Sequence, residues 1–91
     1  MAKVEIYTTP FCGYCARAKG LLDGKGAEYE ETDVMMDDKK RTEMRERARR
    51  TTVPQIFING QHIKGWRSLE PLIESGEIDR LLQATPAVSP G

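Results

Sequence analysis

The sequence has no surplus of charge of either sign and no long hydrophobic run. Its 14 Lys and Arg balance 14 Asp and Glu, so no global positive field attracts nucleic acid or an anionic membrane. No apolar run approaches the ~18–20 residues that a membrane span needs. The opening, Met-Ala-Lys-Val-Glu-Ile-Tyr, shows no apolar segment behind a basic start, so no secretory signal is expected. These absences favour the reducing cytoplasm, where permanent structural disulfides are rare.

Cysteine and histidine are also scarce. The two cysteines, Cys12 and Cys15, form one Cys-x-x-Cys pair, and His62 is the single histidine. A disulfide closing so short a loop would contribute only roughly 2 kcal/mol, which is little for a structural cross-link. A structural zinc site needs four ligands, usually two such pairs or a Cys pair with a His pair. We therefore interpret His62 as a partly exposed strand residue and expect no metal site.

The 91 residues suit one small domain, and their hydrophobic pattern predicts alternating strands and helices. An alternating apolar pattern over 3–8 predicts a first strand, and Asn59-Gly60 is a strong hairpin signal. The expected order is β-α-β-α-β-β-α-α, with strands at 3–8, 28–34, 56–58 and 61–63, helices at 12–24, 36–50, from 68 and around 78–82, and a frayed tail at 84–91. This order predicts an α/β fold with a mixed four-stranded sheet and helices on both faces.

Two of the expected helices carry recognisable start signals. Asp37 and Asp38 fall in the first turn of the charged helix, where carboxylates complement the helix dipole. Ser68 is a suitable cap for the third helix, and Pro71 would then lie in its first turn, where proline is tolerated.

The cysteine pair lies where the first strand gives way to the first helix. Unpaired backbone N–H groups at a helix start favour the thiolate form of Cys12. Cys15, one turn further, shares the inward face with Ala18 and Leu22. One exposed, activated thiol beside one shielded thiol is what a nucleophile and a resolving thiol require. A redox role is therefore favoured over a structural one.

Cys-Gly-Tyr-Cys after the first strand, followed by Thr52-Val53-Pro54 before the hairpin, resembles the glutaredoxins of the thioredoxin-fold superfamily. The similarity runs from Val4 to about Leu82 and implies a glutaredoxin domain at 1–83 with a flexible tail at 84–91. It implies that Pro54 is a cis-proline beside the cysteine pair, which turns the backbone of Val53 toward a bound peptide.

The resemblance also implies glutathione as the thiol partner, because Tyr14 stands inside the motif where thioredoxins carry proline. It assigns Cys12 as the nucleophile and Cys15 as the resolving thiol. The positions that match glutathione-binding residues are Tyr14, Arg41, Thr52, Val53, Pro54, Gly65, Arg67 and Ser68. Arg41 is equally interpretable as one more solvated charge.

Two departures from the glutaredoxin pattern bear on glutathione recognition. Thr9 stands where many members have a lysine that helps to activate the nucleophile. The segment Lys64-Gly65-Trp66-Arg67-Ser68 stands where many members have Gly-Gly-Cys-Asp-Asp, so the usual acidic pair is lost and Arg67 would instead meet the γ-glutamyl ammonium. Trp66 is expected either to cover the site or to pack beside it.

The resemblance implies a glutathione-dependent thiol–disulfide oxidoreductase acting on protein–glutathione mixed disulfides and protein disulfides. No metal or organic cofactor is then required, and a monomer is expected. Two alternatives stay open. One is a [2Fe–2S] carrier in which Cys12 and glutathione from two subunits ligate the cluster, as in relatives with a small residue at the Gly13 position. The other is a thioredoxin-like reductase recharged by a flavoprotein.

Overall fold

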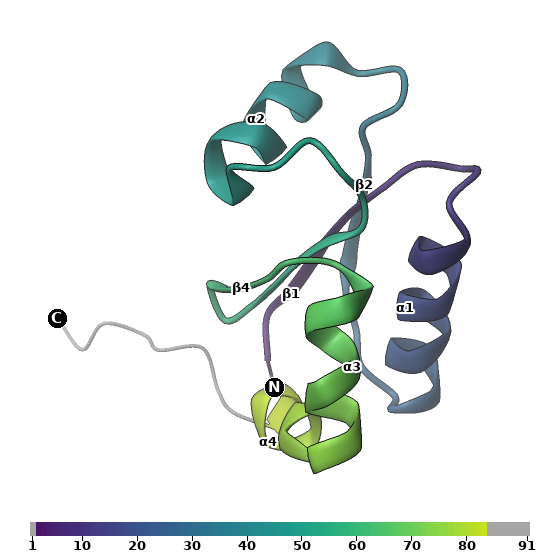
Figure 1. Cartoon of the computed structure of the whole chain (residues 1–91), viewed down its shortest axis with the longest axis vertical. Helices are drawn as coiled ribbons and strands as arrows, with labels where there is room; N and C mark the ends of the chain where they lie inside the picture. The colour runs from purple at the N-terminus through teal and green to yellow at the C-terminus, as the bar shows by residue number, and fades with distance from the viewer. Residues whose placement is uncertain (1, 84–91) are drawn as a thin grey trace, which may run out of the picture.

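The computed structural model describes residues 2–83, which form four strands and four helices in the predicted order (Figure 1). The expected tail at 84–91 lies outside the described residues. Within residues 2–83 no helix combines the length and the apolarity needed to cross a membrane. The elements are β1 (Val4–Thr8), α1 (Gly13–Gly24), β2 (Glu30–Asp33), α2 (Asp38–Ala48), β3 (Gln55–Ile58), β4 (Gln61–Ile63), α3 (Trp66–Ser75) and α4 (Glu77–Gln83).

The four strands form one mixed sheet in the order β2-β1-β3-β4. β1 runs parallel to β2 and antiparallel to β3, and β3 pairs antiparallel with β4. Asn59 and Gly60, with φ of 53° and 83°, make the turn between β3 and β4, the geometry that Asn-Gly adopts readily. The predicted sheet is confirmed. β1 is an inner strand of this sheet, so the C-terminal end of β1, and the start of α1 that follows it, lie between neighbouring strands and not at the side of the sheet.

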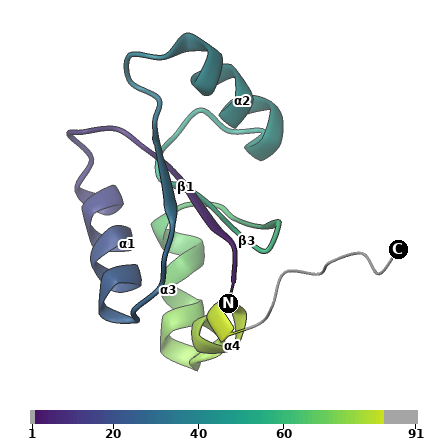
Figure 2. The ribbon, with the colours of Figure 1, turned by 180° about the vertical axis from the view of Figure 1, so that it is seen from behind.

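One face of the sheet carries an aliphatic core beneath α1, α3 and α4 (Figures 1 and 2). Alternation in β1 and β3 supplies the sheet side of this core, because side chains two residues apart point to the same face. Its buried members are Val4, Ile6, Ala18, Leu22, Ile56, Ile58, Ile63, Leu69 and Ile78.

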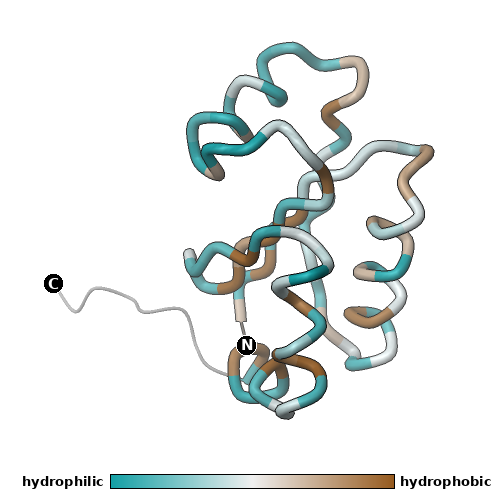
Figure 3. Tube along the Cα trace, in the orientation of Figure 1, coloured by the Kyte–Doolittle hydropathy of each residue, from teal (hydrophilic) through white to brown (hydrophobic). Residues whose placement is uncertain are grey.

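The opposite face carries a smaller core beneath α2, formed by Tyr7, Val34, Met44, Ala48 and Phe57. Figure 3 shows α2 as hydrophilic along most of its length, whereas brown and teal residues alternate in the central strands. Only Met44 and Ala48 of this helix are buried, as predicted. Helices therefore flank both faces, and the α2 face rests on few apolar contacts.

The start of α3 corrects one prediction. Gly65, not Ser68, occupies the cap position, and its carbonyl accepts the N–H groups of Ser68 and Leu69 at 3.3 and 3.1 Å. Its φ of 87° is a left-handed conformation that glycine adopts without a steric penalty. The helix therefore begins three residues earlier than a serine cap would allow, and Pro71 becomes its sixth residue, beyond the first turn.

The start of α2 differs slightly from expectation. Asp37 precedes the helix as its cap and accepts the N–H of Lys40 at 3.1 Å, while Asp38 alone lies in the first turn. The carboxylate of Asp37 thus binds a free N–H directly.

Candidate functional site

Cys12 is the cap residue of α1. Its backbone is extended, with φ −111° and ψ 111°, and its Sγ accepts the backbone N–H of Cys15 at 3.1 Å. The side chain of a cap residue normally satisfies one of the unpaired N–H groups of the first turn. Here that acceptor is a sulfur atom, so Cys12 Sγ takes the place of the usual side-chain oxygen at the start of the helix.

Cys15 differs sharply from Cys12 in its surroundings. It is 1% exposed, whereas Cys12 is half-buried. Burial, together with the neighbouring Cys12 sulfur, raises the pKa of the Cys15 thiol to about 12, against smaller opposing effects of the Thr9 backbone and Lys19. The two sulfurs therefore differ as the pattern predicted, with Cys15 held as a protonated, shielded thiol.

A charged cluster lies one helical turn beyond Cys15. The ammonium of Lys19 lies 2.9 Å from the carboxylate of Glu31 on β2, and the buried hydroxyl of Thr8 donates to the same carboxylate oxygen at 2.7 Å. The hydrogen bond from Lys19 lowers the pKa of Glu31. Sequence analysis did not identify this cluster, because its members come from three separate elements.

The loop before β3 brings Val53 to the cysteine pair. The peptide bond between Val53 and Pro54 is cis, as the resemblance implied. The Cys12 thiol donates a hydrogen bond to the carbonyl oxygen of Val53 at 3.7 Å, long but within reach for sulfur. Thr52 is exposed and Pro54 is buried.

Gly65 lies against the same loop. A Cβ atom at this position would stand 3.3 Å from the carbonyl oxygen of Pro54, so the close approach needs a glycine. Gly65 is also the cap residue of α3, so the first turn of this helix begins next to the Val53–Pro54 segment. Arg67 and Ser68 in this turn are exposed. The N–H groups at this helix start are suited to an anion.

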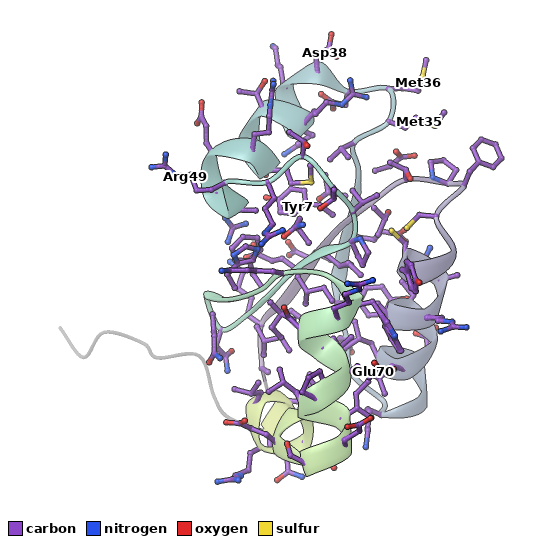
Figure 4. The ribbon with its side chains drawn as sticks, viewed as in Figure 1. Tyr7, Met35, Met36, Asp38, Arg49 and Glu70 are labelled. Carbon is purple, nitrogen blue, oxygen red and sulfur yellow. The ribbon has the colours of Figure 1, made fainter. Side chains whose placement is uncertain are left out.

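Arg41 lies on α2, at the β2–α2 loop. Its guanidinium donates to the carbonyl oxygen of Met35 at 2.6 Å and lies 3.8 Å from Asp38. Figure 4 shows Met35, Met36 and Asp38 together at this end of the molecule. Among the described residues Arg41 contacts no other predicted site residue.

A buried hydrogen-bond chain that sequence analysis missed supports the loop before β3. Gln55 is fully buried, and its amide nitrogen donates to the carbonyl and hydroxyl oxygens of Thr52 at 2.9 and 3.2 Å. Its amide oxygen lies 2.7 Å from Nε2 of His62, whose ring stacks on Phe57. His62 is partly exposed, as predicted. No group of three or more metal-ligating side chains occurs within residues 2–83.

Two aromatic residues flank the cysteine pair on the α1–α3 side. Tyr14 is 56% exposed beside Cys12. Trp66 is half-buried and packs on the aliphatic core. The guanidinium of Arg17 lies over both rings, 5.8 Å from the Tyr14 centroid and 5.9 Å from the Trp66 centroid. Trp66 therefore packs at the rim of the site. The spacing of Tyr14 and Arg17, three residues apart on one helix, was the available sequence signal.

Comparison with known proteins identifies the family. The glutaredoxin family model matches residues 4–63. Glutaredoxin 3 of Escherichia coli K12 is 51% identical over 83 residues, which cover 91% of this chain and all of that one. A buckwheat glutaredoxin–glutathione complex is 28% identical with a TM-score of 0.80, covering 89% of this chain and 76% of that chain. A structure described as "Metal Binding of Glutaredoxins" is 49% identical with a TM-score of 0.69, covering 92% and 91%. The chain therefore belongs to the glutaredoxin family of thiol–disulfide oxidoreductases.

Proposed function

We propose that the chain reduces protein–glutathione mixed disulfides and protein disulfides, with glutathione as the reductant and Cys12 as the nucleophile. The observation that carries the proposal is the asymmetry of the two sulfurs. Cys12 caps α1 and accepts an N–H, whereas Cys15 is buried with a raised pKa. A thiolate, not a thiol, attacks a disulfide, so only Cys12 is suited to begin the reaction.

With a glutathionylated protein, the Cys12 thiolate attacks the glutathione sulfur. A Cys12–glutathione disulfide forms, and the protein cysteine leaves as a thiolate with the electron pair of the broken bond. The thiolate of a second glutathione then attacks the bound glutathione sulfur. Glutathione disulfide forms, and Cys12 leaves as a thiolate. Each step exchanges one S–S bond for another, so no metal or organic cofactor takes part.

With a protein disulfide, Cys12 forms a mixed disulfide with one substrate sulfur, and the other substrate sulfur leaves as a thiolate. Cys15 gives its proton to the substrate thiolate released in the first step and attacks the Cys12 sulfur, and the substrate sulfur bound to Cys12 leaves as the second thiolate. An internal Cys12–Cys15 disulfide remains, which two glutathiones reduce. The short spacing supports this role, because the Cys15 N–H already lies 3.1 Å from Cys12 Sγ.

We assign glutathione to the surface around Cys12. Val53 and Thr52 offer backbone groups that pair with an extended cysteinyl segment, beside Tyr14 and the buried Pro54. The start of α3, beside Gly65, offers the exposed residues Arg67 and Ser68 and the free backbone N–H of Arg67 to the γ-glutamyl carboxylate. Arg41 would meet the glycine carboxylate only after exchanging its contact with the Met35 carbonyl oxygen.

The test is turnover of hydroxyethyl disulfide with glutathione and glutathione reductase. Cys12→Ser should abolish turnover, because no other thiolate caps the helix. Cys15→Ser should retain it, because a second glutathione completes the reaction. Equal loss in both variants would exclude the route through glutathione alone. Recharging by thioredoxin reductase, with no response to glutathione, would favour the thioredoxin-like alternative.

A second candidate function is suggested by the half-buried Cys12 at the helix start and by the exposed Gly13. A Cβ at Gly13 would meet no atom within 4 Å, so the helix start is open on this side. We propose this surface as the place where two chains, each with Cys12 and one glutathione, would supply the four thiolates of a [2Fe–2S] cluster. Anaerobic reconstitution with iron, sulfide and glutathione tests it: a colourless monomer would exclude the carrier function.

The proposed chemistry also places the chain in the cytoplasm, where glutathione is kept reduced. A monomer suffices for turnover, because both sulfurs and the proposed glutathione surface belong to one chain.

A further inference from the structure

One side of the catalytic surface carries an arginine fixed between two aromatic rings. Arg17 is exposed, yet its guanidinium lies within 6 Å of the ring centroids of both Tyr14 and Trp66. Cation–π contacts of this kind are attractive even at exposed sites. Trp66 is itself anchored on the aliphatic core. The charge of Arg17 is therefore held in one place, unlike that of a freely rotating surface arginine.

A second arginine adjoins Trp66 in the sequence. Arg67 follows Trp66 directly in the first turn of α3 and is exposed. Neither Arg17 nor Arg67 forms an ion pair with any residue of the described range 2–83. Glu70, three residues after Arg67, lies on α3 in Figure 4 and is bound to neither arginine. The surface thus has two cations without an acidic counterpart.

We propose that Arg17, held by Tyr14 and Trp66, forms with Arg67 a docking surface for an acidic segment of the protein substrate. This inference deepens the proposed function, because the segment would flank the substrate cysteine that Cys12 attacks. Its occupant is argued from charge complementarity, since two exposed and unpaired guanidinium groups favour carboxylates.

The geometry also limits where the acidic residues of the substrate lie. Arg17 follows Cys12 by five residues, which corresponds to ~7.5 Å of rise along α1. An extended peptide advances ~3.3 Å per residue. Asp or Glu two to three residues from the substrate cysteine therefore reaches the surface, whereas a more distant acid passes beyond it.

The decisive experiment measures single-turnover attack of Cys12, in the Cys15→Ser background, on three peptides of one design. Each peptide carries one cysteine as a thiopyridyl disulfide, with Asp, Asn or Lys at the second and third positions. The thiolate forms a disulfide with the peptide sulfur, and thiopyridone leaves with the electron pair and absorbs light. Glutathione takes no part, so the result is independent of glutathione turnover.

At low ionic strength we expect the Asp peptide to react roughly tenfold faster than the Lys peptide, with the Asn peptide between them. This preference should largely disappear in 0.5 M salt, because exposed charges are screened there. Equal rate constants for the three peptides at low salt would overturn the proposal.

Three variants locate the effect. Arg17→Gln should reduce the Asp-to-Lys ratio about threefold, whereas Arg17→Lys should retain most of it because the charge persists. Arg45→Gln, which removes an exposed charge from α2, is the matched control and should leave the ratio unchanged. An equal reduction by Arg17→Gln and Arg45→Gln would show a general charge effect and contradict the assignment. The reference activity of Arg17→Gln with hydroxyethyl disulfide should match that of the unmodified chain.

The failure of this inference differs from a failure of the proposed function. Charge discrimination without glutathione turnover would support the docking surface and contradict the glutathione-dependent reaction. Turnover with glutathione but no charge discrimination would support the glutathione-dependent reaction and contradict the docking surface.

Discussion

The two faces of the sheet are built by different means. Beneath α1, α3 and α4 the contacts are aliphatic, with Ile6, Ile58 and Ile78 fully buried. Beneath α2 a smaller buried core is joined by polar contacts: the Tyr7 hydroxyl donates to Glu43 at 2.5 Å and accepts from Arg47 at 2.9 Å. One face therefore depends chiefly on burial, which has no direction, and the other combines burial with oriented hydrogen bonds.

This difference corresponds to two tasks at the site. The aliphatic face holds α1 against the sheet and so keeps Cys15 buried beneath Cys12. The polar face reaches the loop before β3, because Gln55 joins His62 to Thr52 through hydrogen bonds. Burial thus keeps the Cys15 thiol protonated, while oriented hydrogen bonds fix the position of the loop backbone that we expect to bind glutathione.

The largest expected effect comes from breaking the aliphatic face. Leu22→Ala removes a side chain that is 1% exposed on α1, and such truncations cost about 2–5 kcal/mol because a cavity remains. Urea denaturation should show this loss in the free energy of unfolding. Leu21→Ala is the matched control, because the neighbouring side chain is only half-buried, and its cost should be clearly smaller. Equal costs would show that α1 does not depend on this core.

The next effect concerns Cys15, whose thiol has its pKa raised to about 12, chiefly by burial. Well below that pH, in the reduced protein, the thiol stays largely protonated and reacts slowly with an added alkylating agent. In a Cys12→Ser variant at pH 8, alkylation of Cys15 by iodoacetamide should be at least about 100-fold slower than that of a free thiol with a pKa of ~8.5. Unfolding in urea should restore the ordinary rate. Rapid alkylation of the folded variant would contradict the burial argument.

A smaller effect is expected from breaking the polar face at Arg47. Its guanidinium lies 4.0 Å from the Phe57 ring centroid and donates to Glu5 and to the Tyr7 hydroxyl. Arg47→Met keeps an unbranched chain but removes these bonds, which should cost about 1–2 kcal/mol in unfolding free energy. Arg45→Met, one half-turn away on the exposed side of α2, should change it by less than about 0.5 kcal/mol.

The sequence predicted the local features of both faces and missed the contacts between elements. Cys12 at a helix start and Asn59-Gly60 in a hairpin follow from neighbouring residues, and the structure has both. The cap of α3 was placed wrongly at Ser68, because a left-handed Gly65 can begin a helix without any side-chain bond. The hydrogen bonds of Gln55 and Arg47 leave no periodic pattern in the sequence. A polar residue in a sequence does not reveal whether its side chain is solvated or bonded within the protein.

The role of Pro54 was predicted only through resemblance. A proline before a strand is ordinarily interpreted as a turn or edge residue, and nothing in the spacing alone indicates a cis bond. The positions of Arg17 and Trp66 needed the structure for a different reason. They come from separate helices, so their contact depends on how α1 and α3 pack together.

The smallest expected effect is a pH dependence of the polar face through His62. Burial lowers the pKa of His62, and the positive charges of Lys64, Arg50 and Arg47 lower it further. The fold thus favours the neutral ring, which stacks on Phe57 and bonds to Gln55. Below the ordinary pKa of ~6.5 the unfolded chain binds a proton more readily than the folded chain. Stability from this residue is therefore complete above that pH and is lost as the pH falls through 6.5 toward the folded pKa.

The matched comparison is His62→Gln, which keeps a hydrogen-bond donor and does not titrate. Urea denaturation at pH 7.5 and 5.5 should show a larger loss of unfolding free energy for the unmodified chain than for the variant. An equal loss in both proteins would assign the acid sensitivity to other groups. A smaller loss in the unmodified chain would mean that the folded state favours the charged ring, with the carboxylates beneath α2 outweighing burial and the nearby cations.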